Sequence, residues 1–89
     1  MNKRQVLGSL GNFIGIEQLG ANQNIIHFEN GSLFQSYESL ICVKIGSSEL
    51  YFTDAWDYSM TTSKYRNKFT QESTQETRSK LESGQHLKI

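Results

Sequence analysis

The sequence contains no proline, a single cysteine and only two histidines among its 89 residues. One cysteine excludes an internal disulfide framework and a cysteine-based zinc site. Apolar runs are short, so no segment has the length of a transmembrane helix. Nine basic and nine acidic residues give a formal net charge of +0, which excludes a global field that would steer the chain onto DNA or an anionic membrane.

The chain does contain enough apolar material for a small folded unit. Hydrophobic residues make up 36% of the sequence and aromatic residues 11%, a composition unlike that of a disordered tail. This length corresponds to one domain, which we assign to residues 1–89. Because a chain this short buries only about 60–65% of its unfolded surface, we expect marginal stability or association, and a homodimer stays open.

Up to about residue 53 the sequence has a pattern typical of β-strands. Residues 12–53 predict a β-meander, since short runs rich in β-branched and aromatic residues alternate with turn residues. Asn30-Gly31 favours a type I′ turn, because both residues tolerate a positive φ. The cross-strand pairs expected from this turn are Phe28 with Leu33 and His27 with Phe34.

Beyond this point the apolar period becomes helical, and helices are predicted at 59–70 and 74–83. The first has one face composed of Tyr58, Thr62, Tyr65 and Phe69. Residues 86–89 alternate and predict a short edge strand. The predicted fold class is therefore α+β, with a small antiparallel sheet of four to six strands followed by two short helices.

The second predicted helix has recognisable ends. Ser73 and Glu76 form an S-x-x-E capping box, and Gly84 suits a left-handed C-terminal cap. Glu76 and Lys80 have the spacing and orientation of a favourable i,i+4 ion pair.

Residues that perform catalysis are scarce. A nucleophilic mechanism would require Cys42 to meet His27 in an open cleft, since His86 lies far along the chain. Cys42 sits in an apolar strand, where burial raises the pKa of a thiol and removes its reactivity. Two distant histidines and scattered carboxylates lack the spacing of metal ligands. We therefore predict no enzyme activity, no catalytic residues, no metal and no cofactor.

Charge is distributed unevenly between the two parts of the chain. Residues 1–60 contain three basic and six acidic groups, whereas residues 61–89 contain six basic and three acidic groups. On the first helix, Lys64, Arg66 and Lys68 predict a compact basic surface able to bind phosphates or carboxylates. A solvated helix face is the alternative interpretation. The polar turn before this helix carries a tryptophan that a partner could cover, and the predicted contact residues are Trp56, Asp57, Lys64, Arg66 and Lys68.

The stretch from Trp56 to Tyr65 reads W-D-Y-S-x-T-T-S-K-Y. Together with residues 19–22, 34–37 and 72–78 it resembles a family of small uncharacterised proteins encoded by bacteriophages, plasmids and other mobile elements of Firmicutes and Bacteroidetes. The resemblance covers about residues 16–85. It implies no established activity, but its context favours proteins that act stoichiometrically on host components, such as inhibitors of host defence.

The leading functional hypothesis is a small non-catalytic binding protein of phage or mobile-element origin. We expect it to act in the host cytoplasm by docking onto a host protein or ribonucleoprotein complex, for example as an anti-CRISPR-like inhibitor, without contacting a membrane. The N-terminal segment faintly resembles a signal peptide, but glycines interrupt its apolar region and no small-residue cleavage site follows. The alternative hypothesis is an accessory module that binds nucleic acid through the basic helix 61–69.

Overall fold

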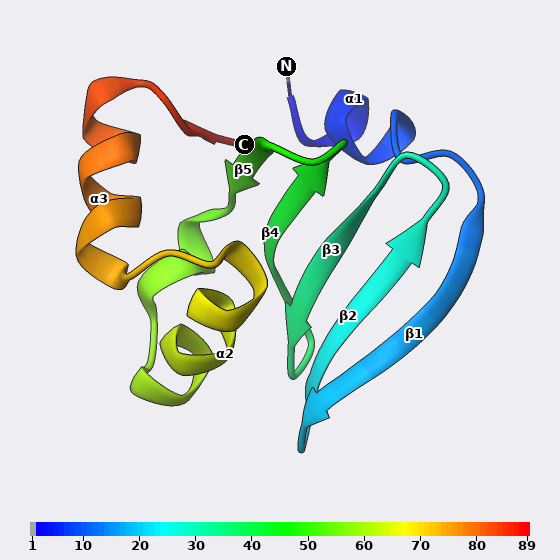
Figure 1. The fold of residues 1–89 in the computed structure, drawn as a ribbon, viewed down its shortest axis with the longest axis horizontal. Coiled ribbons are helices and arrows are strands. Elements are labelled where there is room, and N and C mark those ends of the chain that lie inside the picture. The colour runs from blue at the N-terminus through cyan, green and yellow to red at the C-terminus, as the bar shows by residue number, and fades with distance from the viewer. Residues whose placement is uncertain (1) are drawn as a thin grey trace.

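The strands form one six-stranded sheet whose spatial order follows the order of the chain (Figure 1). The structure is a computed structural model and describes residues 2–89. Strands β1 to β5 are antiparallel neighbours, whereas β6 pairs with β5 in parallel. The strands are β1 (Phe13–Gly20), β2 (Gln23–Phe28), β3 (Gly31–Ser36), β4 (Ser39–Ile45), β5 (Glu49–Phe52) and β6 (Leu87–Lys88).

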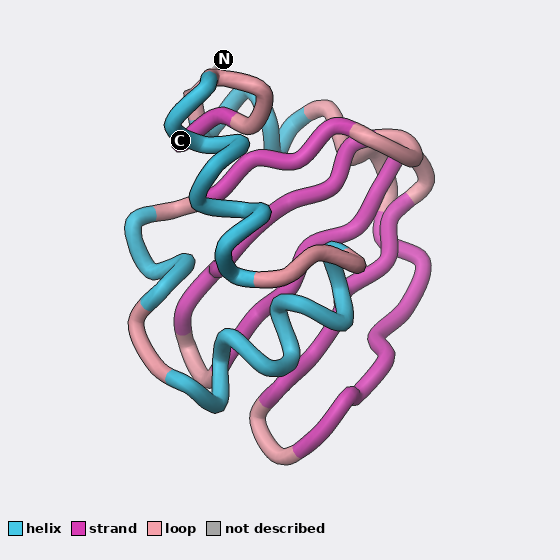
Figure 2. The backbone as a smooth tube through the Cα atoms, turned by 60° about the vertical axis from the view of Figure 1, so that its left-hand side comes forward, coloured by secondary structure: helices cyan, strands magenta, loops and turns pink. Residues whose placement is uncertain are grey.

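The helical segments are α1 (Lys3–Gly8), the 3-10 helix η1 (Asp54–Asp57), α2 (Met60–Thr70) and α3 (Thr74–Ser83). Figure 2 shows α2 and α3 in front of the sheet, as a layer of their own. The α+β class, the meander and the order of sheet before helices are confirmed. None of the helices in residues 2–89 has the length and apolar character needed to cross a membrane.

The start of α2 and both ends of α3 follow from local side-chain chemistry, and the two caps of α3 are those predicted. The Ser59 hydroxyl accepts a hydrogen bond from the Thr62 amide at 3.0 Å, which satisfies a free donor at the start of α2. Ser73 and Glu76 form the complete capping box of α3. Gly84 ends α3 with a φ of 83°, a conformation that costs glycine little.

The sheet buries a different cluster on each face. On the face covered by α2, the cluster consists of Phe34, Ile41, Cys42, Leu50, Phe52 and Phe69. On the opposite face, a smaller cluster consists of Val6, Leu10, Val43 and Tyr51. We call the first the helix face and the second the open face, because α1 is only six residues long and contributes one buried side chain, Val6.

The sequence did not predict α1. Its first turn is closed by Asn2 and Gln5, whose side chains form a capping box. Val6 and Leu10 are then held by the open-face cluster. A helix this short is marginal by itself, so packing against the sheet decides its existence.

The predicted geometry of the β2–β3 turn is wrong. Phe28 pairs with Gly31, so the turn residues are Glu29 and Asn30, and neither Asn30 nor Gly31 has a positive φ. An added Cβ on Gly31 would lie 2.1 Å from the Lys44 carbonyl oxygen. Glycine is therefore required here for the close approach of β4 and not for turn conformation. The observed pairs are Ile25 with Phe34 and Ile26 with Leu33.

Candidate functional site

The predicted contact residues do not form one exposed surface. Asp57, Lys64 and Lys68 are exposed, whereas Trp56 is half-buried. Arg66 has a relative exposure of 0%. The prediction of a basic surface containing Lys64, Arg66 and Lys68 is therefore wrong for Arg66.

Arg66 is buried because it belongs to the stripe of α2 that faces the sheet. Thr62, Arg66, Phe69 and Thr70 are the buried residues of this helix, at a spacing that places them on one face. The predicted aromatic face is correct for Phe69 and Thr62, but Tyr58 precedes α2 and is 52% exposed. The prediction took the aromatic residues as the buried face of the helix, and it therefore placed Arg66 on the solvent-exposed side, which is wrong.

The Arg66 guanidinium is surrounded by neutral acceptors. Nη1 donates to the Trp56 carbonyl oxygen and, at 3.3 Å, to the Ser63 hydroxyl. Nη2 donates to Asn67 Oδ1 at 3.0 Å and to Thr74 Oγ1 at 2.6 Å. Within residues 2–89, Nε has no hydrogen-bond partner and the guanidinium makes no direct ion pair.

This environment leaves a buried positive charge with little direct compensation. Burial lowers the pKa of the Arg66 guanidinium from its ordinary value, and the charge of Asp57 acts in the opposite direction. Arginine nevertheless stays protonated, because its ordinary pKa is so high.

Two guanidinium groups lie against the indole of Trp56. The Arg66 Cζ lies 5.1 Å and the Arg78 Cζ 5.5 Å from the centre of the indole. The indole also contacts the Phe52 ring edge-on, with the centroids 6.3 Å apart. Asp57 accepts a hydrogen bond from Arg78 at 2.7 Å. The segment around Trp56 therefore fastens η1 to α2 and α3, and Trp56 is less exposed than the sequence predicted.

A groove lies beside this network, between η1, α2 and the start of α3. Its volume is about 560 Å³. Among the predicted contact residues, it is lined by Asp57 and Lys64. The remaining residues that line it are Tyr58, Ser59, Met60, Ser63, Asn67 and Thr74. We call it the α2 groove.

Lys64 and Lys68 occupy different positions relative to the α2 groove, although both approach the same aromatic ring. Their ammonium groups lie 5.5 Å and 5.2 Å from the centre of the Tyr65 ring. Only Lys64 lines the groove.

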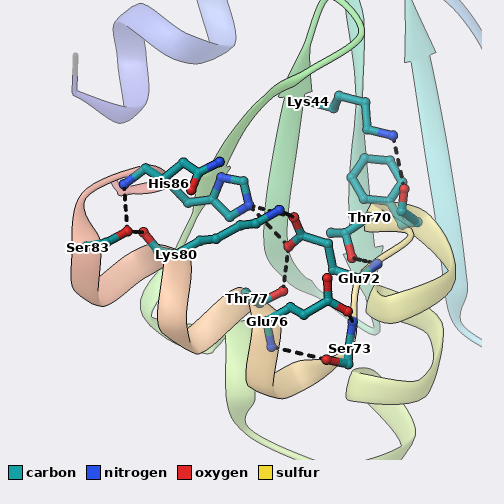
Figure 3. A network of polar contacts seen from close by, with 11 residues as sticks. Lys44, Thr70, Glu72, Ser73, Glu76, Thr77, Lys80, Ser83 and His86 are labelled. Atoms are coloured by element: carbon teal, nitrogen blue, oxygen red, sulfur yellow. Dashed lines mark hydrogen bonds and ion pairs between the residues drawn. The ribbon is translucent and has the colours of Figure 1, made fainter.

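A second polar network joins α3 to the C-terminal segment (Figure 3). Glu72 accepts hydrogen bonds from Lys80 Nζ at 2.6 Å and from Thr77 at 2.9 Å, and its carboxylate lies 3.0 Å from His86 Nε2. Burial alone would raise the pKa of the Glu72 carboxyl, but the bonds from Lys80, His86 and Thr77 outweigh it and hold the pKa below its ordinary value. Lys80 thus bonds Glu72 instead of the predicted Glu76.

This network positions β6. The His86 side chain is nearly fully buried and its ring lies 5.4 Å from that of Phe52. The bond from His86 to Glu72 therefore fixes the chain just before it pairs with β5. No local pattern links residues 72 and 86, so the sequence did not indicate this contact.

The thiol and imidazole considered for catalysis are separated. Cys42 is fully buried in the helix-face cluster, and burial raises the pKa of its thiol far above the ordinary value. His27 lies on β2, with β3 between it and β4, and contacts Glu17 at 3.0 Å. Within residues 2–89, no three histidine, cysteine, aspartate or glutamate residues are grouped as metal ligands.

Large apolar side chains are exposed on strand β1. Phe13, Ile14 and Ile16 are 59%, 65% and 65% exposed. Phe13 contacts Phe28 edge-on at 6.1 Å, and Ile16 pairs with Ile26. Through these partners Phe13 and Ile16 extend the apolar surface of the open face beyond the part that α1 covers.

The model of a family of unknown function, DUF8033, matches residues 1–85. The chain belongs to the DUF8033 family. This match includes the first fifteen residues, which the resemblance described above leaves out. No curated protein and no solved structure matches the chain.

For this member of DUF8033, two features of the candidate site were not accessible from sequence patterns. The burial of Arg66 depends on four neutral acceptors from η1, α2 and α3. The exposure of β1 depends on the shortness of α1. The helical spacing of Thr62, Arg66 and Phe69 would have indicated the burial of Arg66 if the arginine had been counted as a core residue.

Proposed function

We propose that this DUF8033 protein is a small non-catalytic binding protein that docks onto another protein, through the open face of β1 and β2. The observation that carries the proposal is the exposure of Phe13, Ile14 and Ile16 next to Phe28. Contiguous exposed apolar side chains are characteristic of protein–protein contact surfaces. The burial of Cys42 away from His27 supports action by contact.

The chemistry of this surface favours a protein partner over nucleic acid. Apolar side chains gain free energy when another apolar surface covers them, whereas nucleic-acid binding depends on neutralising phosphates. With Arg66 buried, α2 presents Lys64 and Lys68 to solvent. Two lysines neutralise few phosphates. Binding of nucleic acid through residues 61–69 is the alternative. It is favoured by the position of the Lys64 and Lys68 ammonium groups, which both lie near the Tyr65 ring.

The biological setting of the proposal comes from the resemblance to proteins of phages and mobile elements. In that setting the partner is a host protein, or the protein part of a host ribonucleoprotein complex, in the host cytoplasm. Inhibition of host defence is the most specific version. The proposed contact differs from the one predicted from sequence, since Trp56 and Arg66 are engaged within the fold.

The test is saturable capture from host lysate by the tagged chain, compared with two variants. Phe13→Ser/Ile16→Ser removes apolar area from the open face, and Tyr37→Asn is the matched control, because Tyr37 is 53% exposed but lies in the turn between β3 and β4. We expect the double variant to lose the partner and the control to retain it. Equal capture by both variants, or no saturable partner for the wild type, would contradict the proposal.

Two further measurements test whether the protein instead binds a second copy of itself or nucleic acid. Light scattering after size-exclusion chromatography reports self-association. If the wild type is a dimer and Phe13→Ser/Ile16→Ser is a monomer, the partner of this surface is a second copy of the chain and not a host protein. Gel shifts at low salt report nucleic-acid binding. Retardation abolished by Lys64→Ala/Lys68→Ala, but not by the β1 variant, would establish the alternative in place of the proposal.

A further inference from the structure

The α2 groove has a wall that is polarised by the buried Arg66. The guanidinium donates to Ser63 Oγ and Thr74 Oγ1, and both residues line the groove. Arg66 itself is fully buried and contributes its charge from behind this wall. A positive charge thus lies under the groove without direct neutralisation by an acidic side chain.

The hydrogen bonds of this wall determine which groups the hydroxyls can bind. A hydroxyl has one proton to donate and lone pairs to accept. Ser63 Oγ and Thr74 Oγ1 use lone pairs to accept from Arg66, and Thr74 Oγ1 also accepts from Asn67 Nδ2 at 3.4 Å. Within residues 2–89, neither hydroxyl donates its own proton to another group. Both protons are therefore available to an acceptor in the groove.

The charges that line the groove also favour one negative group. Lys64 lines the groove, and its ammonium lies 5.5 Å from the centre of the Tyr65 ring, so its flexible side chain has to turn to meet a ligand there. Asp57 is the opposing charge, and it is already bonded to Arg78 at 2.7 Å. The free backbone amides at the start of α2 add a partial positive charge. Lys64 and Arg66 together outnumber Asp57, the one acidic residue that lines the groove, and Asp57 is also bonded to Arg78.

We infer that the α2 groove binds the side-chain carboxylate of an acidic segment on a partner protein. The donors to that carboxylate are the hydroxyls of Ser63 and Thr74 together with Lys64. Met60 and Tyr58, which are 91% and 52% exposed, provide apolar contact for the neighbouring residues of the segment. A dianionic phosphate would bring two negative charges next to Asp57, whereas a carboxylate brings one, so Asp57 disfavours the phosphate.

This inference does not depend on the proposed contact through β1. The groove lies among η1, α2 and α3 on the helix side, whereas the exposed residues of β1 belong to the open face. Each site is tested with its own variants, so failure at one leaves the result at the other intact.

The experiment is an NMR titration of the full chain at fixed ionic strength. The probe is N-acetyl-glutamate N-methylamide, and the matched neutral probe is N-acetyl-glutamine N-methylamide. We expect saturable shifts of the amides of 59–64 and 74 with the glutamate probe, in the millimolar range typical of so small a ligand. Shifts of equal size with the glutamine probe would overturn the inference.

Two lysine variants distinguish the groove from diffuse attraction. Lys64→Gln and Lys68→Gln change the net charge equally, and both side chains contact Tyr65, but only Lys64 lines the groove. We expect Lys64→Gln to weaken binding about fivefold and Lys68→Gln to leave it unchanged. Equal weakening by the two variants would overturn the inference.

The hydroxyl wall is tested separately. Ser63→Ala and Thr74→Val each remove one donor, and Thr74→Ser restores it. We expect the first two to weaken binding of the glutamate probe and Thr74→Ser to bind like the wild type, in chains whose spectra remain dispersed. Tighter binding of inorganic phosphate than of the glutamate probe would identify a phosphate site and overturn the assignment of a carboxylate.

Discussion

The two faces of the sheet differ in how completely they are covered. On the helix face, Phe34, Cys42 and Phe52 are 0% exposed under α2 and η1. On the open face, Phe13 and Ile16 are 59% and 65% exposed, although they lie in the same sheet. The comparison indicates that one face supplies most of the stabilising burial, whereas the other leaves large apolar side chains exposed.

The difference arises from the lengths of the covering elements. The helix face is covered by α2, of eleven residues, and by the segment around η1 that Arg66 and Trp56 fasten in place. The open face has only α1, of six residues, near Val43 and Tyr51. A helix of six residues spans about 9 Å, less than the width of three strands. Strands β1 and β2 are therefore left with exposed apolar residues.

The largest expected effect contrasts a phenylalanine from each face. Phe34→Ala leaves a cavity in the helix-face cluster, where its ring stacks on Phe69 at 6.0 Å. We expect a loss of about 3–5 kcal/mol in the free energy of unfolding. Phe13→Ala should change it by about 0.5 kcal/mol. Urea unfolding measures both, and similar losses would show that the open face supports the fold as much as the helix face.

The next effect contrasts the arginine and a lysine of α2. Arg66→Ala removes the donors to the Trp56 carbonyl, Ser63, Asn67 and Thr74. We expect a loss of about 3 kcal/mol, because the variant removes a large buried side chain together with these hydrogen bonds. Lys68→Ala, at an exposed position of the same helix, should cost about 0.5 kcal/mol or less. Thermal unfolding compares them. Equal stability of the two variants would contradict a structural role for Arg66.

A smaller effect is expected for the polar network around Glu72, whose contribution to the free energy of unfolding depends on pH. The pKa of Glu72 is lowered in the folded chain, so its contribution to stability is present above the ordinary pKa of a glutamate, about 4.3. That contribution is lost as the pH falls through the lower pKa of the folded state. We expect Glu72→Gln to cost about 2 kcal/mol at pH 7 and to flatten the loss of stability in acid.

The control for this measurement is Glu82→Gln, which changes an exposed carboxylate on α3. Urea unfolding between about pH 2 and pH 7 should show the wild-type acid dependence in this variant. An unchanged acid dependence in Glu72→Gln would exclude the network as its source.

The smallest effect concerns reactivity on the helix face. Because burial raises the pKa of the Cys42 thiol, we expect iodoacetamide to leave the native chain unmodified and to label it fully in urea. Ser47→Cys/Cys42→Ala is the matched control, since Ser47 is exposed, and it should react in the native state. Mass spectrometry measures both. Fast native labelling of Cys42 would show that the helix face opens readily.

The parts of the fold that were predictable are those specified by neighbouring residues. The capping box of Ser73 and Glu76 and the glycine cap at Gly84 depend on contacts within a few residues, and both are present. The strands of the meander follow from β-branched runs and turns. The type I′ turn at Asn30-Gly31 was wrong because the same residues also meet β4 and the N-terminal segment, a contact absent from any local pattern.

The candidate site was less predictable than the fold. Asp57 and Lys64 do line one groove, but Lys68 lies outside its lining and Arg66 beneath its wall. Trp56 packs between arginines that come from α2 and α3. These positions depend on how η1 and the two helices cross, which composition and spacing leave open.

Local sequence by itself thus determined the α+β class, the order of the strands before α2 and α3, and the ends of α3, because hydrogen bonds and periodicity within a few residues specify them. Tertiary structure alone decided that Arg66 is buried among neutral acceptors, that β6 is held by Glu72 and His86, and that β1 retains exposed apolar residues. Each of these depends on segments distant in the chain, whose packing sets which side chains lose contact with water.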